Sequence, residues 1–134
     1  MLVYDRFMKK RVREIYRAFD GKLHGSGTMK WAVCRTLAKM PEEVIDHITS
    51  DCWFLASTPD AFGFTFSGDD VAGKHLIVLS DDLLVQSNEQ IAYTISHEIG
   101  HVILGHRNAI MAPQSKREIA QQEQEAHEFA LRYL

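Results

Sequence analysis

The sequence predicts a single α+β domain over residues 1–134, in which N-terminal helices pack around a small sheet and two long helices complete the fold. Three observations lead to this prediction. Apolar residues recur at helical spacing over the first fifty residues, short strand-like runs bounded by Pro, Gly and Asp fill the middle, and helical spacing returns after residue 87. A chain of 134 residues with 46% hydrophobic content can fill one core.

Three helices are predicted in the N-terminal part of the chain. Apolar side chains recur every three to four residues over residues 3–19, which indicates an amphipathic helix. A second helix begins near Thr28, a residue type that can cap its first turn. Pro41 suits the first turn of a third helix, and Glu42 and Glu43 stabilise the positive end of that helix. These helices offer packing surface and carry no chemical motif.

The middle of the chain predicts three strands of an antiparallel or mixed sheet. The strand-like runs cover residues 52–55, 62–66 and 75–79. A turn at residues 67–70 would join the second strand to the third. Ser80 would then begin a short helix. The second strand alternates three aromatic residues that are expected in the core, namely Phe62, Phe64 and Phe66.

The clearest helical signal begins at Ser87 and ends at Gly105. Ser87 and Gln90 are spaced as a capping box, and glycine is typical of the position just after a helix. The apolar residues of this helix gather on one side, and helix geometry places His97 and His101 on the opposite side. A last helix runs from about residue 116 to the end, with an apolar stripe among many Glu and Gln residues.

The motif HEIGH at residues 97–101 indicates a metal site within that helix. Histidines four residues apart lie one turn above each other, so both imidazoles can reach the same ion. In zinc hydrolases with this spacing, two neutral imidazoles hold Zn²⁺ and the glutamate takes a proton from the attacking water. The motif therefore predicts His97 and His101 as zinc ligands and Glu98 as general base. Gly100 on the histidine side would let another segment approach closely.

A catalytic zinc site needs a third protein ligand, and the last helix is its natural source. A third histidine at the metzincin spacing is excluded, because Leu104 and Arg107 occupy the positions where that motif has glycine and histidine. A glutamate is therefore expected, and helix geometry alone does not choose between Glu123 and Glu125. The acidic candidates on the last helix are Glu118, Glu123, Glu125 and Glu128.

Taken with residues 125–130 (EAHEFA), the HEIGH motif resembles the ImmA/IrrE family of zinc metallopeptidases, which pairs a HExGH helix with a downstream EAxxFA helix. The resemblance covers about residues 74–134, which would form the metal-binding core. It implies a zincin-like fold, Zn²⁺ bound by His97, His101 and Glu125, and Glu98 as general base. It also implies a protein substrate, often a transcriptional repressor.

The sequence thus predicts a zinc metallo-endopeptidase that hydrolyses a peptide bond in a protein or peptide substrate. An exposed strand at residues 74–79 would align the substrate backbone. Tyr93, His106 and His127 are candidates for stabilising the oxyanion, and the sequence does not choose among them. The alternative is a catalytically inactive metal-binding module that recognises a partner protein without cutting it.

Composition excludes several other classes of protein. The net charge is −3 with acids and bases interspersed, so no basic surface for nucleic acid is expected. Cys34 and Cys52 lack the spacing of a disulfide framework or a metal site, which favours reduced thiols and a cytoplasmic location. Neither a leader peptide nor a membrane span is recognisable in the sequence. Nothing in the sequence indicates an oligomeric state.

Overall fold

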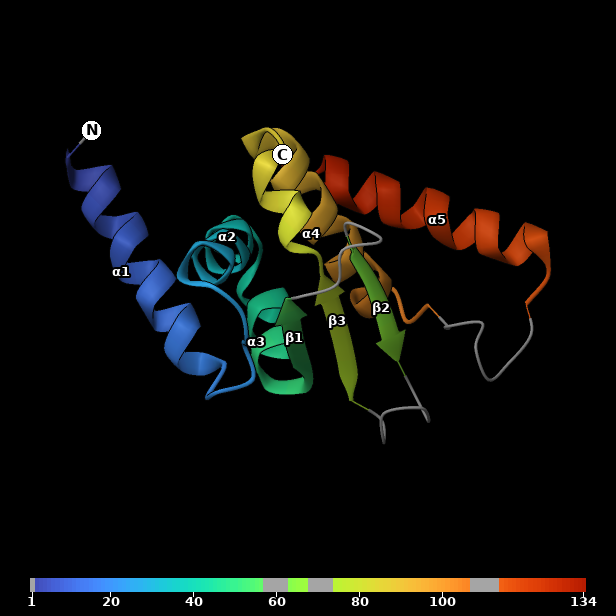
Figure 1. Cartoon of the computed structure of the whole chain (residues 1–134), viewed down its shortest axis with the longest axis horizontal. Coiled ribbons are helices and arrows are strands. Elements are labelled where there is room, and N and C mark those ends of the chain that lie inside the picture. Colours follow the sequence, from blue (N-terminus) through green and yellow to red (C-terminus); the bar gives the residue numbers. More distant parts are fainter. Residues whose placement is uncertain (1, 57–62, 68–73, 107–113) are drawn as a thin grey trace.

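The computed structural model describes residues 2–56, 63–67, 74–106 and 114–134, and it confirms the predicted α+β class (Figure 1). Helices and strands mix along the chain, with the sheet and helix α4 lying between α1 and α5 (Figure 1). In chain order the elements are α1 (Leu2–Ala18), α2 (Gly27–Leu37), α3 (Glu42–Asp51), β1 (Cys52–Ala56), β2 (Gly63–Ser67), β3 (His75–Leu79), the 3₁₀ helix η2 (Asp81–Val85), α4 (Asn88–Ile103) and α5 (Lys116–Leu131).

The N-terminal helices follow the prediction, with one correction at a helix start. Helix α2 is capped by Ser26, whose Oγ accepts a hydrogen bond from the amide of Met29 at 3.1 Å. The prediction that Thr28 caps this helix is therefore wrong, because Ser26 has the extended backbone that a capping residue needs. Helix α3 follows Pro41 with Glu42 and Glu43 in its first turn, as predicted.

The sheet is mixed and has the strand order β1-β3-β2. Strand β3 pairs in parallel with β1 and antiparallel with β2, so it is the central strand. The prediction that residues 74–79 form an exposed strand is therefore wrong, and β2 is the edge strand on one side of the sheet. Residues 68–70 of the predicted turn at 67–70 lie outside the described residues, and so do Phe62 and the side chains of Phe64 and Phe66.

One hydrophobic core joins the N-terminal helices, the sheet and the two long helices. Helix α4 is central to it, because Ile95 and Ile99 are fully buried and Val102 is nearly so. Helix α5 packs against the other side of α4 through Ala126, Phe129 and Ala130, all of which are buried. None of the helices that the structure describes is long and apolar enough to cross a membrane.

Candidate metal centre

The two histidines of the HEIGH motif lie side by side on α4, one helical turn apart. Ser87 starts this helix by accepting a hydrogen bond from the amide of Gln90 at 3.1 Å, which is half of the predicted capping box. The side chain of Gln90 does not complete the box and bonds Thr94 instead, at 3.0 Å. The Nε2 atoms of His97 and His101 lie 3.2 Å apart, on the side of α4 that α5 covers.

The carboxylate of Glu123 on α5 contacts the imidazoles of both histidines. Its Oε2 lies 2.9 Å from Nε2 of His97, and its Oε1 lies 3.1 Å from Nε2 of His101. The three side chains offer ligand atoms that all lie within 4.8 Å of one another. Glu123 precedes Ala126 by three residues, so it projects from the side of α5 that packs on α4.

Glu125, the third ligand expected from the family resemblance, contacts a different histidine. Its Oε1 lies 3.2 Å from Nε2 of His106. Residues two apart on a helix point about 200° away from each other, so Glu123 and Glu125 leave α5 on different sides. The positions of the side chains therefore favour Glu123 over Glu125 as the third ligand. The helical spacing of the sequence alone did not decide between the two.

The spacing of these three side chains fits a tetrahedral zinc ion. Bonds of about 2.0–2.1 Å at tetrahedral angles hold two ligand atoms about 3.3 Å apart. The two Nε2 atoms lie 3.2 Å apart, and the Glu123 carboxylate presents one oxygen to each of them, Oε2 at 2.9 Å from His97 and Oε1 at 3.1 Å from His101. Burial lowers the pKa of His101 well below its usual range, which keeps this imidazole neutral at pH 7, as a metal ligand must be. Two imidazoles and one carboxylate are also the donor set of many catalytic zinc sites.

Glu98 is a buried carboxyl group beside this cluster, with only 6% of its surface exposed. Its side chain reaches strand β2, where the hydroxyl of Thr65 donates a hydrogen bond to its Oε2. Burial raises the pKa of Glu98 to about 7, although the hydrogen bond from Thr65 acts in the opposite direction. A carboxyl group with this pKa can both accept and release a proton near neutral pH.

Two further aromatic side chains border the cluster. The Tyr93 hydroxyl lies 2.6 Å from Nδ1 of His127, and the Tyr93 ring is centred 5.7 Å from the ring of His97. His127 follows Glu123 by one turn of α5. His106, the third candidate for oxyanion stabilisation, instead contacts His101 and Glu125.

Thr65 is a site residue that sequence reasoning missed. No local signal marks it, since a threonine in a strand is common and its contact with Glu98 joins positions 33 residues apart. Glu123 did have a signal, because it precedes the buried Ala126 by three residues and Ala130 by seven. That spacing placed it on the packed side of the last helix.

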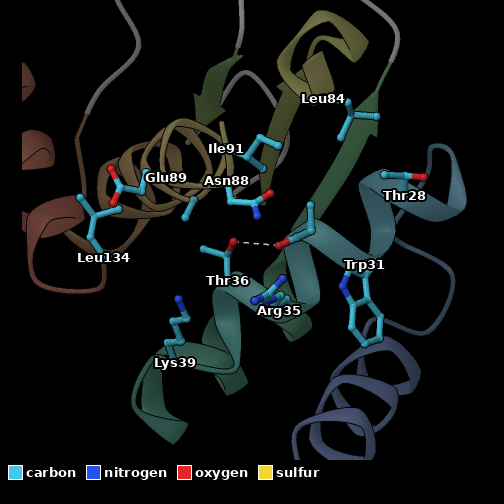
Figure 2. Close-up of a pocket in the computed structure, with 12 residues that line it drawn as sticks. Thr28, Trp31, Arg35, Thr36, Lys39, Leu84, Asn88, Glu89, Ile91 and Leu134 are labelled. Atoms are coloured by element: carbon cyan, nitrogen blue, oxygen red, sulfur yellow. Dashed lines mark hydrogen bonds between the residues drawn. The ribbon is translucent and has the colours of Figure 1, made fainter. Parts of the chain in front are cut away.

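A pocket of about 380 Å³ lies elsewhere on α4 (Figure 2). Helix α2 contributes Trp31 and Arg35 to its wall, Lys39 in the turn after that helix adds to it, and the first turn of α4 contributes Asn88 and Glu89. None of the side chains in the metal cluster lines this pocket, so the two features share a helix and use different parts of it.

Residues 86–134 match the family model described as Peptidase U49. The match covers well under half of the chain, and it contains both α4 and α5, so all three members of the metal cluster fall inside it. The C-terminal part of the chain is therefore similar to a peptidase family, which supports proteolytic activity, whereas the finer resemblance to ImmA/IrrE stays a prediction. No curated protein and no solved structure matches the chain.

Proposed function

We propose that this protein is a zinc-dependent metallo-endopeptidase of the zincin type. The proposal rests on one observation, which is that ligand atoms of His97, His101 and Glu123 all lie within 4.8 Å of one another. The buried carboxyl group of Glu98 beside that point adds the proton acceptor that peptide hydrolysis requires. The similarity of residues 86–134 to a peptidase family supports the same reaction.

In this proposal His97, His101 and Glu123 hold Zn²⁺, which when bound would polarise the scissile carbonyl and lower the pKa of a water molecule. Glu98 accepts the proton of the attacking water and later returns it to the leaving amine. Thr65 orients the Glu98 carboxylate through its hydrogen bond to Oε2. Burial raises the pKa of Glu98 in the metal-free chain, which favours its holding the proton between the two steps.

We place the substrate backbone along the edge strand β2, in place of the strand predicted from the sequence. Strand β2 carries Thr65, so a peptide that adds to this edge would pass beside Glu98. The proposed metal-binding core therefore comprises residues 74–134 together with β2. A protein or peptide is the proposed substrate, and the buried free thiols of Cys34 and Cys52 fit the proposed cytoplasmic location.

The proposal is tested by the metal content and peptidase activity of the purified protein. We expect one zinc per chain, with zinc lost in His97→Ala and in Glu123→Gln. The activity assay uses a mixture of quenched fluorescent peptides, analysed for new N-termini by mass spectrometry. The wild-type protein should cleave some of these peptides, and a chelator should stop the cleavage.

Glu98→Gln separates a peptidase from a metal-binding module that does not cut its partner. The substitution keeps the size of the side chain and removes its ability to accept a proton. For a peptidase we expect full zinc content and no cleavage. If the wild-type protein binds zinc but neither protein cleaves any peptide or partner, the binding module is the better description.

A further inference from the structure

We propose that Glu125 and His106 act as positioning residues that hold His101 in the one tautomer and orientation that can bind a metal. This inference rests on the proposed function, because it assigns a role toward the zinc ion of that site. The observations behind it are the fold of the chain after α4 and two hydrogen bonds between side chains.

The chain after α4 is folded back by a Schellman motif. Gly105 has a φ of +68°, which an L side chain rarely adopts. Its amide donates to the carbonyl of Val102 at 3.1 Å, and the amide of His106 donates to the carbonyl of His101 at 3.0 Å. This pattern brings the side chain of His106 against that of His101, where such motifs commonly have a hydrophobic contact.

Here the two side chains are imidazoles, and they are joined by a hydrogen bond. The Nδ1 atoms of His101 and His106 lie 2.9 Å apart, and Nε2 of His106 lies 3.2 Å from Oε1 of Glu125. The side chain of His106 is only 7% exposed, whereas that of Glu125 is 43% exposed. Both ring nitrogens of a buried imidazole are therefore satisfied, one by His101 and the other by a carboxylate that reaches solvent.

The direction of these hydrogen bonds is fixed once the carboxylate is ionised. Glu125 can only accept, so Nε2 of His106 carries a proton, and in the neutral imidazole its Nδ1 is then an acceptor. Nδ1 of His101 must then donate to His106, which leaves the lone pair on Nε2 of His101. That is the atom facing Glu123 and His97. The chain from Glu125 to His101 thus selects the tautomer that the metal site needs.

The two glutamates of α5 therefore have different roles. Glu123 offers a ligand atom, and Glu125 acts through His106 on a histidine ligand. Partners of this kind commonly change metal affinity by about 10- to 100-fold when they are removed. The effect of Glu125 should disappear when His106 can no longer transmit it, and this dependence distinguishes a positioning residue from a ligand.

The test measures zinc affinity of the full chain by competition with a chromophoric chelator. We expect His106→Ala and Glu125→Gln each to weaken binding, by about 10- to 100-fold for the alanine variant. The double variant should bind as weakly as His106→Ala alone. His106→Asn should recover most of the affinity, because its amide oxygen can accept the hydrogen bond from His101. The matched control is Glu128→Gln, an exposed residue of the same helix that has the same charge change, and it should bind zinc normally.

Spectra of the cobalt-substituted protein add a second measurement. His106→Ala should shift the visible absorption bands of bound Co²⁺, because the orientation of His101 changes while the ligand set is retained. Thermal melts of the metal-free variants check that each one is folded. If the His106→Ala variant is unfolded, the comparison is made with His106→Asn instead.

Three outcomes overturn the inference or its basis, and they are distinguishable. Unchanged zinc affinity in both His106→Ala and Glu125→Gln overturns the positioning role alone. If Glu125→Gln lowers zinc affinity by the same factor in the wild-type and His106→Ala backgrounds, Glu125 is a ligand. This result also overturns the positioning role. A wild-type protein that binds no zinc, or a His97→Ala variant that binds it equally well, overturns the proposed function itself.

Discussion

Gly100 and Phe129 are in direct contact where α4 and α5 cross. A β-carbon at position 100 would lie 3.0 Å from Cδ1 of Phe129 and 3.2 Å from its Cβ and Cγ. The close approach that the sequence predicted for Gly100 is therefore confirmed. Because Phe129 and Glu123 belong to the same helix, this contact sets how near the glutamate comes to His97 and His101.

Gly100→Ala should weaken zinc binding. Alanine gains about 1 kcal/mol over glycine in a helix, but crowding in a packed core costs about 1–3 kcal/mol. Phe129 is 4% exposed and its ring is centred 5.1 Å from that of Tyr133, so it has little room to retreat. We expect α5 to shift and zinc affinity to fall roughly five-fold or more, as a loss of about 1 kcal/mol implies. Chelator competition measures this change.

The second substitution Phe129→Leu in the Gly100→Ala background serves as the control, because a smaller side chain leaves room for the new methyl group. It should recover part of the zinc affinity. A Gly100→Ala protein that melts at a higher temperature and binds zinc normally would show that Phe129 yields without moving α5.

Much of the fold could be predicted because its signals are local. Ser87 caps α4 by bonding an amide three residues ahead, and Gly105 ends the helix through its positive φ. Strand β3 was predicted with the bounds that the structure shows, since a short apolar run between turn residues needs no distant information. The HEIGH motif likewise carries both histidines within one turn.

What could not be predicted depends on contacts between distant segments. The order of the strands decides that β3 is central, and no local pattern encodes that order. The choice between Glu123 and Glu125 depends on how α5 is rotated against α4, which the packing of Ala126 and Ala130 sets. Thr65 reaches Glu98 only because β2 lies beside α4. The spacing of Glu123 to Ala126 made it one of two candidates, and tertiary packing decides between them, whereas the role of Thr65 comes from tertiary packing alone.

Thr65→Val should move the pH profile of peptide hydrolysis. The hydrogen bond from Thr65 lowers the pKa of Glu98, so its removal should raise that pKa. A base that must be ionised is then available only at higher pH, and the acid limb of kcat/KM should shift upward. Steady-state kinetics between pH 5 and 9, a range spanning about two units either side of a pKa near 7, measure the shift.

Zinc content is the control for Thr65→Val, because the hydrogen bonds of Thr65 described above go to Glu98, which is not one of the three proposed ligands. It should stay at the wild-type level. An unchanged acid limb would mean that Glu98 is not the group whose ionisation limits the reaction.

Cys34 and Cys52 should be unreactive in the folded protein. Both are almost fully buried, with 1% and 0% of their surfaces exposed, and burial raises the pKa of each thiol to about 12. The reactive thiolate is therefore almost absent at pH 8. A chromogenic disulfide reagent should modify neither cysteine in the native state and both in denaturant. Rapid modification of a native thiol would show that the core around β1 or α2 opens more readily than its burial implies.

His127 should contribute to catalysis and not to metal binding. The Tyr93 hydroxyl lies 2.6 Å from its Nδ1, and when that hydroxyl donates, the proton of His127 is on Nε2, where it can bond a developing oxyanion. Loss of one such donor typically costs about 100- to 1,000-fold in kcat. We expect a decrease of this order in His127→Ala with zinc content unchanged, and a smaller decrease in Tyr93→Phe, which removes only the group that orients the imidazole. If both variants instead lose zinc, Tyr93 and His127 support the metal cluster and the oxyanion is stabilised elsewhere.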